Sequence, residues 1–242
     1  QVDKYLLKMC NKQRLLELMY DFVLFDGGVK KLPRVHQYFG IKAAQESIRK
    51  REGGIIWHTQ GSGKSIVMVL LAKWILENNP NARVAIITDR DELDKQIKRV
   101  FEDAGETIYR TTSGKDLMNQ LAQPKPMLLC SLVHKFGKRE VENFDDFIHE
   151  LENQPTKTIG ELFVFVDECH RTQSGKLHDA MKLILPDSLF IGFTGTPLLK
   201  KDKQKSIEVF GPYIGNPYKF DEAVEDGVVL DLLYEARDVE QF

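Results

Sequence analysis

The sequence predicts an α/β fold in which helices cover both faces of a parallel sheet. Five short runs of aliphatic, aromatic and β-branched residues alternate with longer stretches of helical periodicity, and polar or glycine-rich motifs follow several of these runs directly. Strands that alternate with helices pair in parallel through right-handed crossovers. Because such sheets bind ligands at the carboxyl ends of their strands, we expect the functional site there.

The predicted elements follow one another regularly along the chain. Strands are expected at residues 54–58, 83–88, 126–131, 162–166 and 189–194. Helices are expected at residues 38–50, 64–78, 91–104, 113–122, 143–152 and 174–184. Ahead of them, apolar side chains recur at near-helical spacing from Leu6 to Phe25 and end at Asp26-Gly27-Gly28, which predicts an N-terminal helical extension.

The composition permits a sizeable core and excludes some classes of function. Of 242 residues 42% are apolar, and 34 Lys and Arg stand against 36 Asp and Glu, so the chain lacks the basic excess of a dedicated nucleic-acid binder. The lysines at 200, 201, 203 and 205 form a basic cluster that we interpret as a solvated loop.

Cysteines at 10, 130 and 169 show neither a disulfide framework nor a metal spacing. With no membrane span and no secretory pattern, these features predict a cytoplasmic protein.

A glycine-rich segment between the first predicted strand and its helix has the composition of a phosphate-binding loop. It reads His58-Thr59-Gln60-Gly61-Ser62-Gly63-Lys64-Ser65. Glycines at 61 and 63 allow positive φ, so that backbone amides can face phosphate oxygens, and the helix start adds partial positive charge. Lys64 is then expected to reach the β- and γ-phosphates of ATP, and the Ser65 hydroxyl to bind Mg²⁺.

One feature of this loop leaves an alternative open. The strict pattern begins with glycine, whereas His58 stands at that position here, so the prediction depends on the core from Gly61 to Ser65. The alternative is a Gly/Ser turn followed by a helix that happens to begin with lysine.

Two adjacent acids, Asp167 and Glu168, end the run at 162–166. Carboxylates at the end of a buried strand are unfavourable unless they face a cleft, a metal or polar partners. Beside a phosphate site, Asp167 is expected to hold Mg²⁺ and Glu168 to orient and deprotonate the attacking water. The alternative is an ordinary acidic strand-to-loop transition.

His170 follows the acids, and a second polar motif follows the run at 189–194. We expect His170 to link the nucleotide site to the hydroxyls of Thr194 and Thr196 through its two ring nitrogens. Taken alone, Thr194-Gly195-Thr196-Pro197 is only a turn signal.

In this order the motifs resemble motifs I, II and III of superfamily 2 helicases and translocases: HTQGSGKS at 58–65, VDECH at 166–170 and FTGTP at 193–197. Longer segments resemble the restriction (R, motor) subunit of type I restriction-modification enzymes: WHTQGSGKS at 57–65, ITDRDELDKQI at 87–97, VFVDECHRTQSGK at 164–176 and FIGFTGTPL at 190–198. The resemblance spans about residues 34 to 230 and implies a RecA-like P-loop NTPase domain that uses ATP and Mg²⁺.

The resemblance implies further site residues. Gln37 corresponds to a glutamine that reads the adenine base, although it could simply be a polar residue that opens the helix. Thr59, Gln60 and Ser62 belong to the nucleotide-binding loop with its glycines. Arg90 corresponds to a position that contacts the DNA backbone in this superfamily, although it could instead be a solvated loop cation. Ser131 stands at the position of a motif that contacts the tracked DNA strand.

The motors of this superfamily have two RecA-like domains with ATP between them, and the second supplies arginines. Residues 1–32 are therefore expected to be a helical extension or connector, 33–230 the first motor domain, and 231–242 the start of a connection to a second domain. There is no Glu-x-Lys nuclease pattern after Pro186-Asp187. We thus expect a fragment that is weakly active or inactive alone.

The function implied by the resemblance is ATP-driven translocation of double-stranded DNA before endonucleolytic cleavage. The expected partners are double-stranded DNA, the methyltransferase and specificity subunits of a restriction-modification complex, and the second RecA-like domain of the parent chain. Two alternatives remain: a generic superfamily 2 DNA or RNA helicase domain, and a docking module for the methyltransferase and specificity subunits.

Overall fold

A six-stranded sheet forms the centre of the molecule. The computed structural model describes residues 7, 9–88, 91–103, 105, 107–132, 149, 159–169, 182, 185–196 and 206–231. The strands are β3 (Gly54–Trp57), β4 (Ala82–Thr88), β5 (Ile108–Thr111), β6 (Leu128–Leu132), β7 (Glu161–Val166) and β8 (Leu189–Thr194). They lie in the order β3-β8-β7-β4-β6-β5, and every pair is parallel. The predicted α/β fold with a parallel sheet is confirmed.

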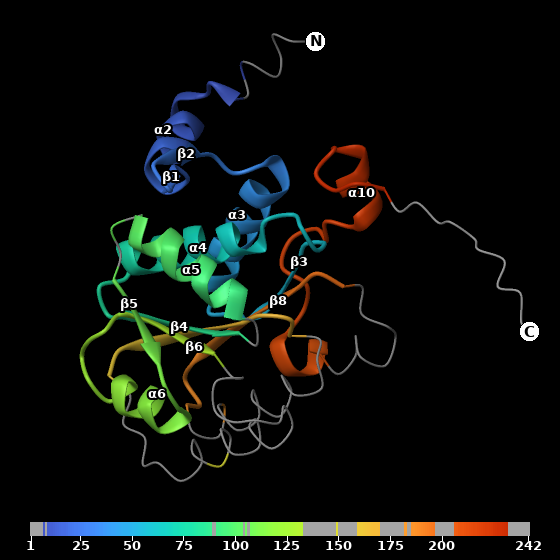
Figure 1. The fold of residues 1–242 in the computed structure, drawn as a ribbon. Helices are drawn as coiled ribbons and strands as arrows, with labels where there is room; N and C mark the ends of the chain where they lie inside the picture. The colour runs from blue at the N-terminus through green and yellow to red at the C-terminus, as the bar shows by residue number, and fades with distance from the viewer. Residues whose placement is uncertain are drawn as a thin grey trace, which may run out of the picture.

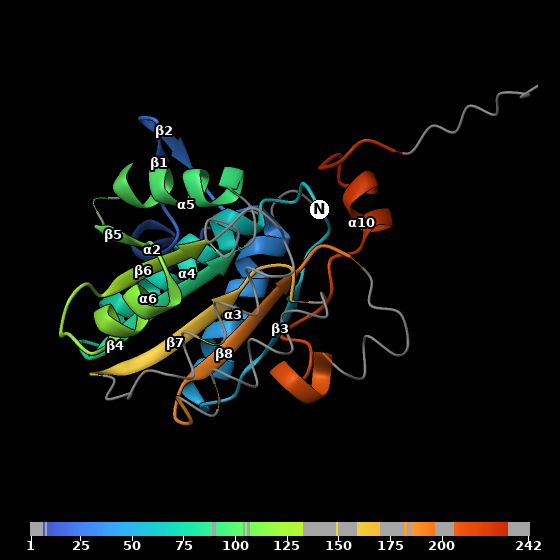
Figure 2. The ribbon, with the colours of Figure 1, turned by 60° about the horizontal axis from the view of Figure 1, so that its bottom comes forward.

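Helices cover both faces of this sheet (Figures 1 and 2). One face packs against α3 (Val35–Arg49), α4 (Lys64–Asn78) and α5 (Asp91–Asp103). The other packs against α6 (Gly114–Leu121) and the helical turn at 206–210. Side chains of a strand alternate between faces, so the buried β4 contributes to both apolar clusters. A strand covered on both sides needs a continuous apolar run, which made most of these strands visible in the sequence.

The N-terminal region contains a helix and a hairpin. Helix α2 (Lys12–Asp21) agrees with the helical prediction, whereas β1 (Leu24–Asp26) and β2 (Val29–Lys31) pair as antiparallel strands. Gly27 and Gly28 connect them with φ angles of 60° and 77°. Two successive positive φ angles match the tight turn that joins twisted strands, so this turn ends the helical pattern before Phe25.

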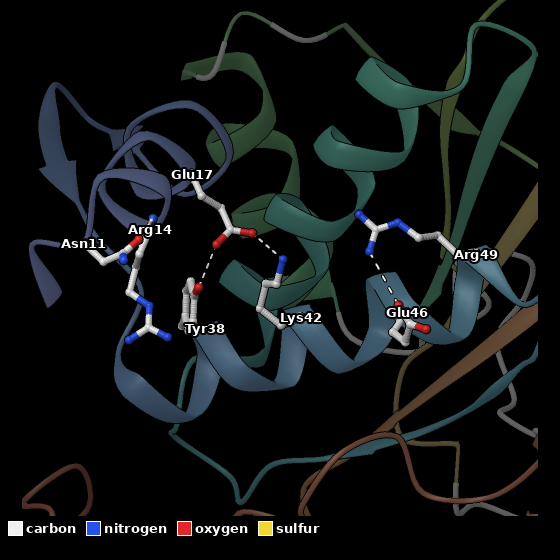
Figure 3. A network of polar contacts seen from close by, with 7 residues as sticks. All are labelled: Asn11, Arg14, Glu17, Tyr38, Lys42, Glu46 and Arg49. Atoms are coloured by element: carbon white, nitrogen blue, oxygen red, sulfur yellow. Dashed lines mark hydrogen bonds and ion pairs between the residues drawn. The ribbon is translucent and has the colours of Figure 1, made fainter. Parts of the chain in front are cut away.

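This N-terminal region is packed into the core. The Phe22 side chain is completely buried, and its ring lies 4.8 Å from that of Tyr38 on α3. Glu17 of α2 accepts hydrogen bonds from the Tyr38 hydroxyl, at 2.7 Å, and from Lys42 (Figure 3). Burial alone would raise the pKa of Glu17, but the hydrogen bonds from Lys42 and Tyr38 lower it below the ordinary value. Helix α2 is thus fixed to α3 by both apolar and ionic contacts.

A segment late in the chain runs along the outer edge of β3. Isolated parallel bridges join Ile55 to Tyr213 and His58 to Tyr218. Helix α10 (Phe220–Glu225) follows and lies beside the end of β3 (Figure 1). Within the part of the chain that the structure describes, no helix combines the length and apolar composition needed to cross a membrane.

Candidate functional site

The strand order brings the predicted motifs to one edge of the sheet. The glycine-rich loop follows β3, the acids follow β7, and β8 lies between these two strands. Neighbouring strands are spaced by about 4.8 Å, so the loop and the acids begin roughly 10 Å apart at the same carboxyl edge. The two motifs therefore lie at one edge of the sheet, on either side of the end of β8.

The loop has the backbone form that the sequence predicts. Gly61 and Gly63 have φ angles of 81° and 86°, and Gly63 precedes the first residue of α4. The Ser62 hydroxyl donates to the Thr59 carbonyl at 2.6 Å, which closes the turn inside the loop. No side chain caps the N-terminus of α4, and this helix end therefore keeps the character of an anion site.

The end of β8 lies directly against this loop. The His58 amide donates to the Thr194 carbonyl at 3.1 Å. A Cβ placed on Gly195 would lie 2.6 Å from the Lys64 Nζ atom and 3.1 Å from the Gln60 amide nitrogen. The Lys64 ammonium group therefore points back across the loop to the strand beside β7, where the acids begin.

Asp167 and Glu168 are both buried at the end of β7. The Thr88 hydroxyl of β4 donates to Asp167 at 3.4 Å, and Glu168 has a φ angle of 47°, which is uncommon for a residue with a side chain. Two adjacent carboxylates removed from water favour a cation close by. The Lys64 ammonium group and a divalent metal ion are the natural candidates.

The acidic motif is joined to β8 through Cys169. Its amide donates to the Phe193 carbonyl at 3.0 Å, and its side chain lies so close to Gly192 that a Cβ there would be 2.6 Å from Sγ. Burial, together with the charges of Glu168 and Asp167, raises the pKa of the Cys169 thiol. The thiol therefore stays protonated and acts as a packing group.

Gln37 lies beside the loop, with its amide hydrogen-bonded inside the protein. Its Nε2 donates to the Ser62 carbonyl at 2.9 Å and to the Gly63 carbonyl at 3.2 Å. Its Oε1 accepts from the Arg34 amide at 2.8 Å. The structure therefore places Gln37 against the loop, and adenine recognition remains a prediction.

The remaining predicted site residues are buried or lie outside the described residues. His170 and Arg90, and the lysines from 200 to 205, fall outside them. Thr194 is fully buried, and its hydroxyl accepts from the Thr196 amide at 3.3 Å, so these two threonines contact each other. Ser131 is the penultimate residue of β6 at the same sheet edge, but it is only 1% exposed and does not face solvent.

Sequence reasoning missed three aromatic residues at the loop. The His58 ring packs edge-on to His36 and Tyr218, and a Cβ on Gly40 would lie 2.9 Å from it. His58 therefore fills a space between the loop and α3, which explains a side chain where the strict motif has glycine. Burial, with the nearby His36 and Lys64, lowers the pKa of His58 to about 3. Nothing in the loop motif indicates that Tyr218 contacts it, because Tyr218 lies 160 residues after His58 in the sequence.

These residues fit ATP and Mg²⁺. The loop is a glycine cradle with positive φ angles, and the lysine lies over it. Ser65, with its hydroxyl, is the second residue of α4, and Asp167, with its carboxylate, follows β7 at the same edge of the sheet. Among the described residues no three or more His, Cys, Asp or Glu side chains form a group suited to a metal. Mg²⁺ is usually held by one or two protein oxygens together with substrate phosphates and water.

Several known proteins are similar to this chain in sequence. It is 31% identical over 253 residues to the putative type I restriction enzyme MjaIXP endonuclease subunit of Methanocaldococcus jannaschii, with 99% of this chain and 23% of that protein covered. It is 32% identical over 252 residues to the type I restriction enzyme HindI endonuclease subunit of Haemophilus influenzae, with 91% and 23% covered. The predicted resemblance to type I restriction motor subunits is confirmed, and the chain spans about a quarter of the length of these relatives.

Solved structures share the fold. A nuclease-deletion mutant of the Type ISP restriction-modification enzyme LlaGI, in complex with a DNA substrate mimic, has a TM-score of 0.57 at 19% identity and covers 82% of this chain and 21% of its own. The Sulfolobus solfataricus SWI2/SNF2 ATPase core in complex with dsDNA has a TM-score of 0.54 at 14% identity, with 86% and 40% covered. The sequence profile of the SWI2/SNF2 ATPase matches residues 36–242. With its RecA-like sheet and this match over most of its length, the chain belongs to the SWI2/SNF2 ATPase family.

Proposed function

We propose that this chain is the ATP-binding motor domain of a type I restriction enzyme R subunit, which couples ATP hydrolysis to translocation of double-stranded DNA before cleavage. The contact between Lys64 and Gly195 carries the proposal, because it brings the cation of the loop to the strand that borders the acids. The type I restriction endonuclease subunits among its relatives support the restriction assignment.

Each residue has a distinct task in this proposal. The amides of the loop from Gly61 to Ser65 and the Lys64 ammonium group bind the phosphates and stabilise the charge that develops on the transferred group. The Glu168 carboxylate orients the attacking water and accepts its proton. Ser65 and Asp167 hold Mg²⁺, which when bound neutralises phosphate charge. His170, Thr194 and Thr196 are proposed to link this site to a neighbouring segment, and Arg90 is proposed to contact the DNA backbone.

The division of the chain follows from the same proposal. Residues 33–230 act as the first RecA-like motor domain, 1–32 as an extension or connector, and 231–242 as the start of a connection to a second RecA-like domain. That domain would supply arginines, which in related reactions raise rates by about three to five orders of magnitude. Double-stranded DNA and the methyltransferase and specificity subunits are the proposed partners, in the cytoplasm.

The test uses the full-length protein together with its methyltransferase and specificity subunits. ATP hydrolysis and displacement of a DNA triplex are measured for the unsubstituted protein and for Lys64→Ala and Glu168→Gln. We expect Lys64→Ala to lose nucleotide binding, and Glu168→Gln to keep binding while hydrolysis falls by about 10² or more. Lys98→Ala on the outer helix α5, where Lys98 pairs with Glu102, is the matched control. Full triplex displacement by Lys64→Ala, or strand separation without displacement by the unsubstituted protein, would refute the proposal.

A further inference from the structure

The phosphate-binding loop is held from two sides by segments that are far apart in the sequence. On one side, Nε2 of His36 lies 3.1 Å from the Ser62 carbonyl, next to the bonds that Gln37 makes to the same stretch. Since a carbonyl can only accept, His36 Nε2 carries the proton. Burial lowers the pKa of His36, which keeps this ring neutral near pH 7.

On the other side, the late segment around Tyr218 forms hydrogen bonds with the first part of the loop. The Thr59 amide donates to the Tyr218 carbonyl at 2.9 Å, and the Tyr218 amide donates to the Trp57 carbonyl at 2.9 Å. Further along the same segment, the Val229 side chain lies 3.3 Å from the position that a Cβ on Gly61 would occupy. The segment thus contacts both the entrance and the tip of the loop.

The two segments that contact the loop are joined to each other by stacked rings. The imidazole of His36 and the ring of Tyr218 are nearly parallel, at 5°, with centroids 3.8 Å apart. The Tyr218 hydroxyl donates to Asp226 at 2.8 Å, which ties the ring to the end of α10. Burial and this bond raise the pKa of Tyr218 to about 12, so the hydroxyl keeps its proton. The stack is therefore fixed at both ends, on α3 and on the late segment.

Peptide planarity gives these contacts a consequence for the ligand. The carbonyl of Ser62 and the amide of Gly63 belong to one rigid plane and point in opposite directions. The same is true of the Gly63 carbonyl and the Lys64 amide. Holding the two carbonyls against α3 therefore aims the two amides away from α3, as an amide-lined phosphate cradle requires.

We infer that His36 and Tyr218 form a positioning pair, which couples the orientation of the phosphate-binding amides to the placement of the segment from Pro212 to Val229. This inference rests on the proposed nucleotide site. The pair acts through the loop, so nucleotide affinity depends on the stack, and nucleotide binding in turn holds the late segment in place. The coupling is reciprocal, as for any two linked equilibria.

A double-mutant cycle in the full-length protein tests the pair, with the affinity for a Mg²⁺-bound fluorescent ATP analogue as the readout. His36→Gln keeps a donor for the Ser62 carbonyl and removes the ring, and Tyr218→Leu removes the other ring. Each single change is expected to weaken binding roughly three- to tenfold, the affinity ratio that matches the usual energy of an aromatic pair. The double variant is expected to bind no more weakly than the worse single variant.

Three further variants separate positioning from simple structural support. Tyr218→Phe keeps the ring and is expected to restore most of the affinity, and Tyr20→Leu, at an exposed ring on α2, is expected to change nothing. If Tyr218→Leu fails to fold, Tyr218→Met replaces it in the cycle, because its flexible apolar side chain fills the space without a ring. Single effects that multiply in the double variant, or Tyr218→Phe as weak as Tyr218→Leu, would overturn the inference.

The same titrations distinguish this inference from the proposed function. Lys64→Ala is included as a reference. If the unsubstituted protein binds no analogue, or if Lys64→Ala binds it unchanged, the proposed nucleotide site is wrong and the inference falls with it. If Lys64→Ala loses binding while the His36 and Tyr218 effects are independent, the nucleotide site stands and the positioning pair is rejected.

Discussion

The ammonium group of Lys64 lies against the backbone of Gly195, so closely that a methyl group on Gly195 would come within 2.6 Å of Nζ. Lys64 opens the helix after β3, whereas Gly195 follows β8. The contact therefore joins the phosphate-binding loop to the neighbouring strand, whose other neighbour ends in the acids. The absence of a side chain at Gly195 decides where the lysine can lie.

Gly195→Ala is accordingly expected to displace the lysine without unfolding the protein. The nearest atom is the end of a flexible side chain, and the Gln60 backbone nitrogen, 3.1 Å from the added methyl group, has to shift by only a few tenths of an ångström. The free energy of unfolding should therefore fall by only about 1 kcal/mol. Affinity for Mg-ATP should fall by about tenfold, because the cation loses its place over the phosphates. Calorimetric titration with ATP and urea denaturation measure the two effects. Unchanged affinity would show that the lysine has another route to the phosphates.

A second glycine on β8 fixes the acidic motif. Gly192→Ala would place a methyl group 2.6 Å from Sγ of Cys169 and 2.9 Å from its Cβ, inside a closely packed region. Overpacking of this kind lowers the free energy of unfolding by about 1–3 kcal/mol. Urea denaturation is expected to show this loss, with partial recovery in the double variant that also carries Cys169→Ala. A loss that Cys169→Ala does not change would place the clash elsewhere.

His58 gives the stability of the protein a dependence on pH. Its pKa is about 3 in the folded state, against an ordinary value of 6.5, so the unfolded chain binds the proton more readily between these values. The free energy of unfolding therefore falls as the pH drops below about 6.5, with a slope of up to about 1.4 kcal/mol per pH unit from this residue.

Urea denaturation between pH 7 and pH 5 measures this slope. His58→Gln should reduce it, whatever its effect on stability at pH 7, because the carboxyl groups contribute equally to both proteins. Because the pKa of His36 is also lowered, the free energy of unfolding of the variant should still depend on pH, with a smaller slope. Parallel curves for the two proteins would mean that His58 is protonated in the folded state.

The sequence predicted most of the sheet because buried strands leave a continuous apolar run. It missed β5, which has only four residues with an exposed Tyr109 among them, and therefore lacks such a run. It also missed the β1–β2 hairpin, where Gly27 and Gly28 form a tight turn and the predicted helical pattern gives way to a strand from Leu24. In both cases a local feature outweighed the periodicity on which the prediction depended.

For the candidate site, the sequence predicted the loop and the acids because each is a contiguous motif after a strand. The ring contacts between His36, His58 and Tyr218 could not be predicted, since they depend on a late segment that meets β3 through isolated bridges. The amide of Gln37 illustrates the same limit. Its residue type suggested base recognition, whereas its bonds to the loop carbonyls follow from the tertiary packing of α3.

The N-terminal extension is expected to be an integral part of the core. Phe22 has no exposed surface and packs on Tyr38, so Phe22→Ala should lower the free energy of unfolding by about 3–5 kcal/mol. Phe25→Ala is the control, because Phe25 is 49% exposed on the hairpin. Urea denaturation compares the two. Similar small losses for both would mean that α2 contributes little to the stability of the domain.

The central claim is that the loop and the acids serve one nucleotide–metal site, and calorimetric titration of ATP with and without Mg²⁺ tests it most directly. Mg²⁺ is expected to tighten ATP binding to the unsubstituted protein. Asp167→Ala should lose most of this tightening while it still binds ATP without Mg²⁺, because the loop that holds the phosphates is unchanged. Equal tightening by Mg²⁺ in both proteins would contradict the shared site.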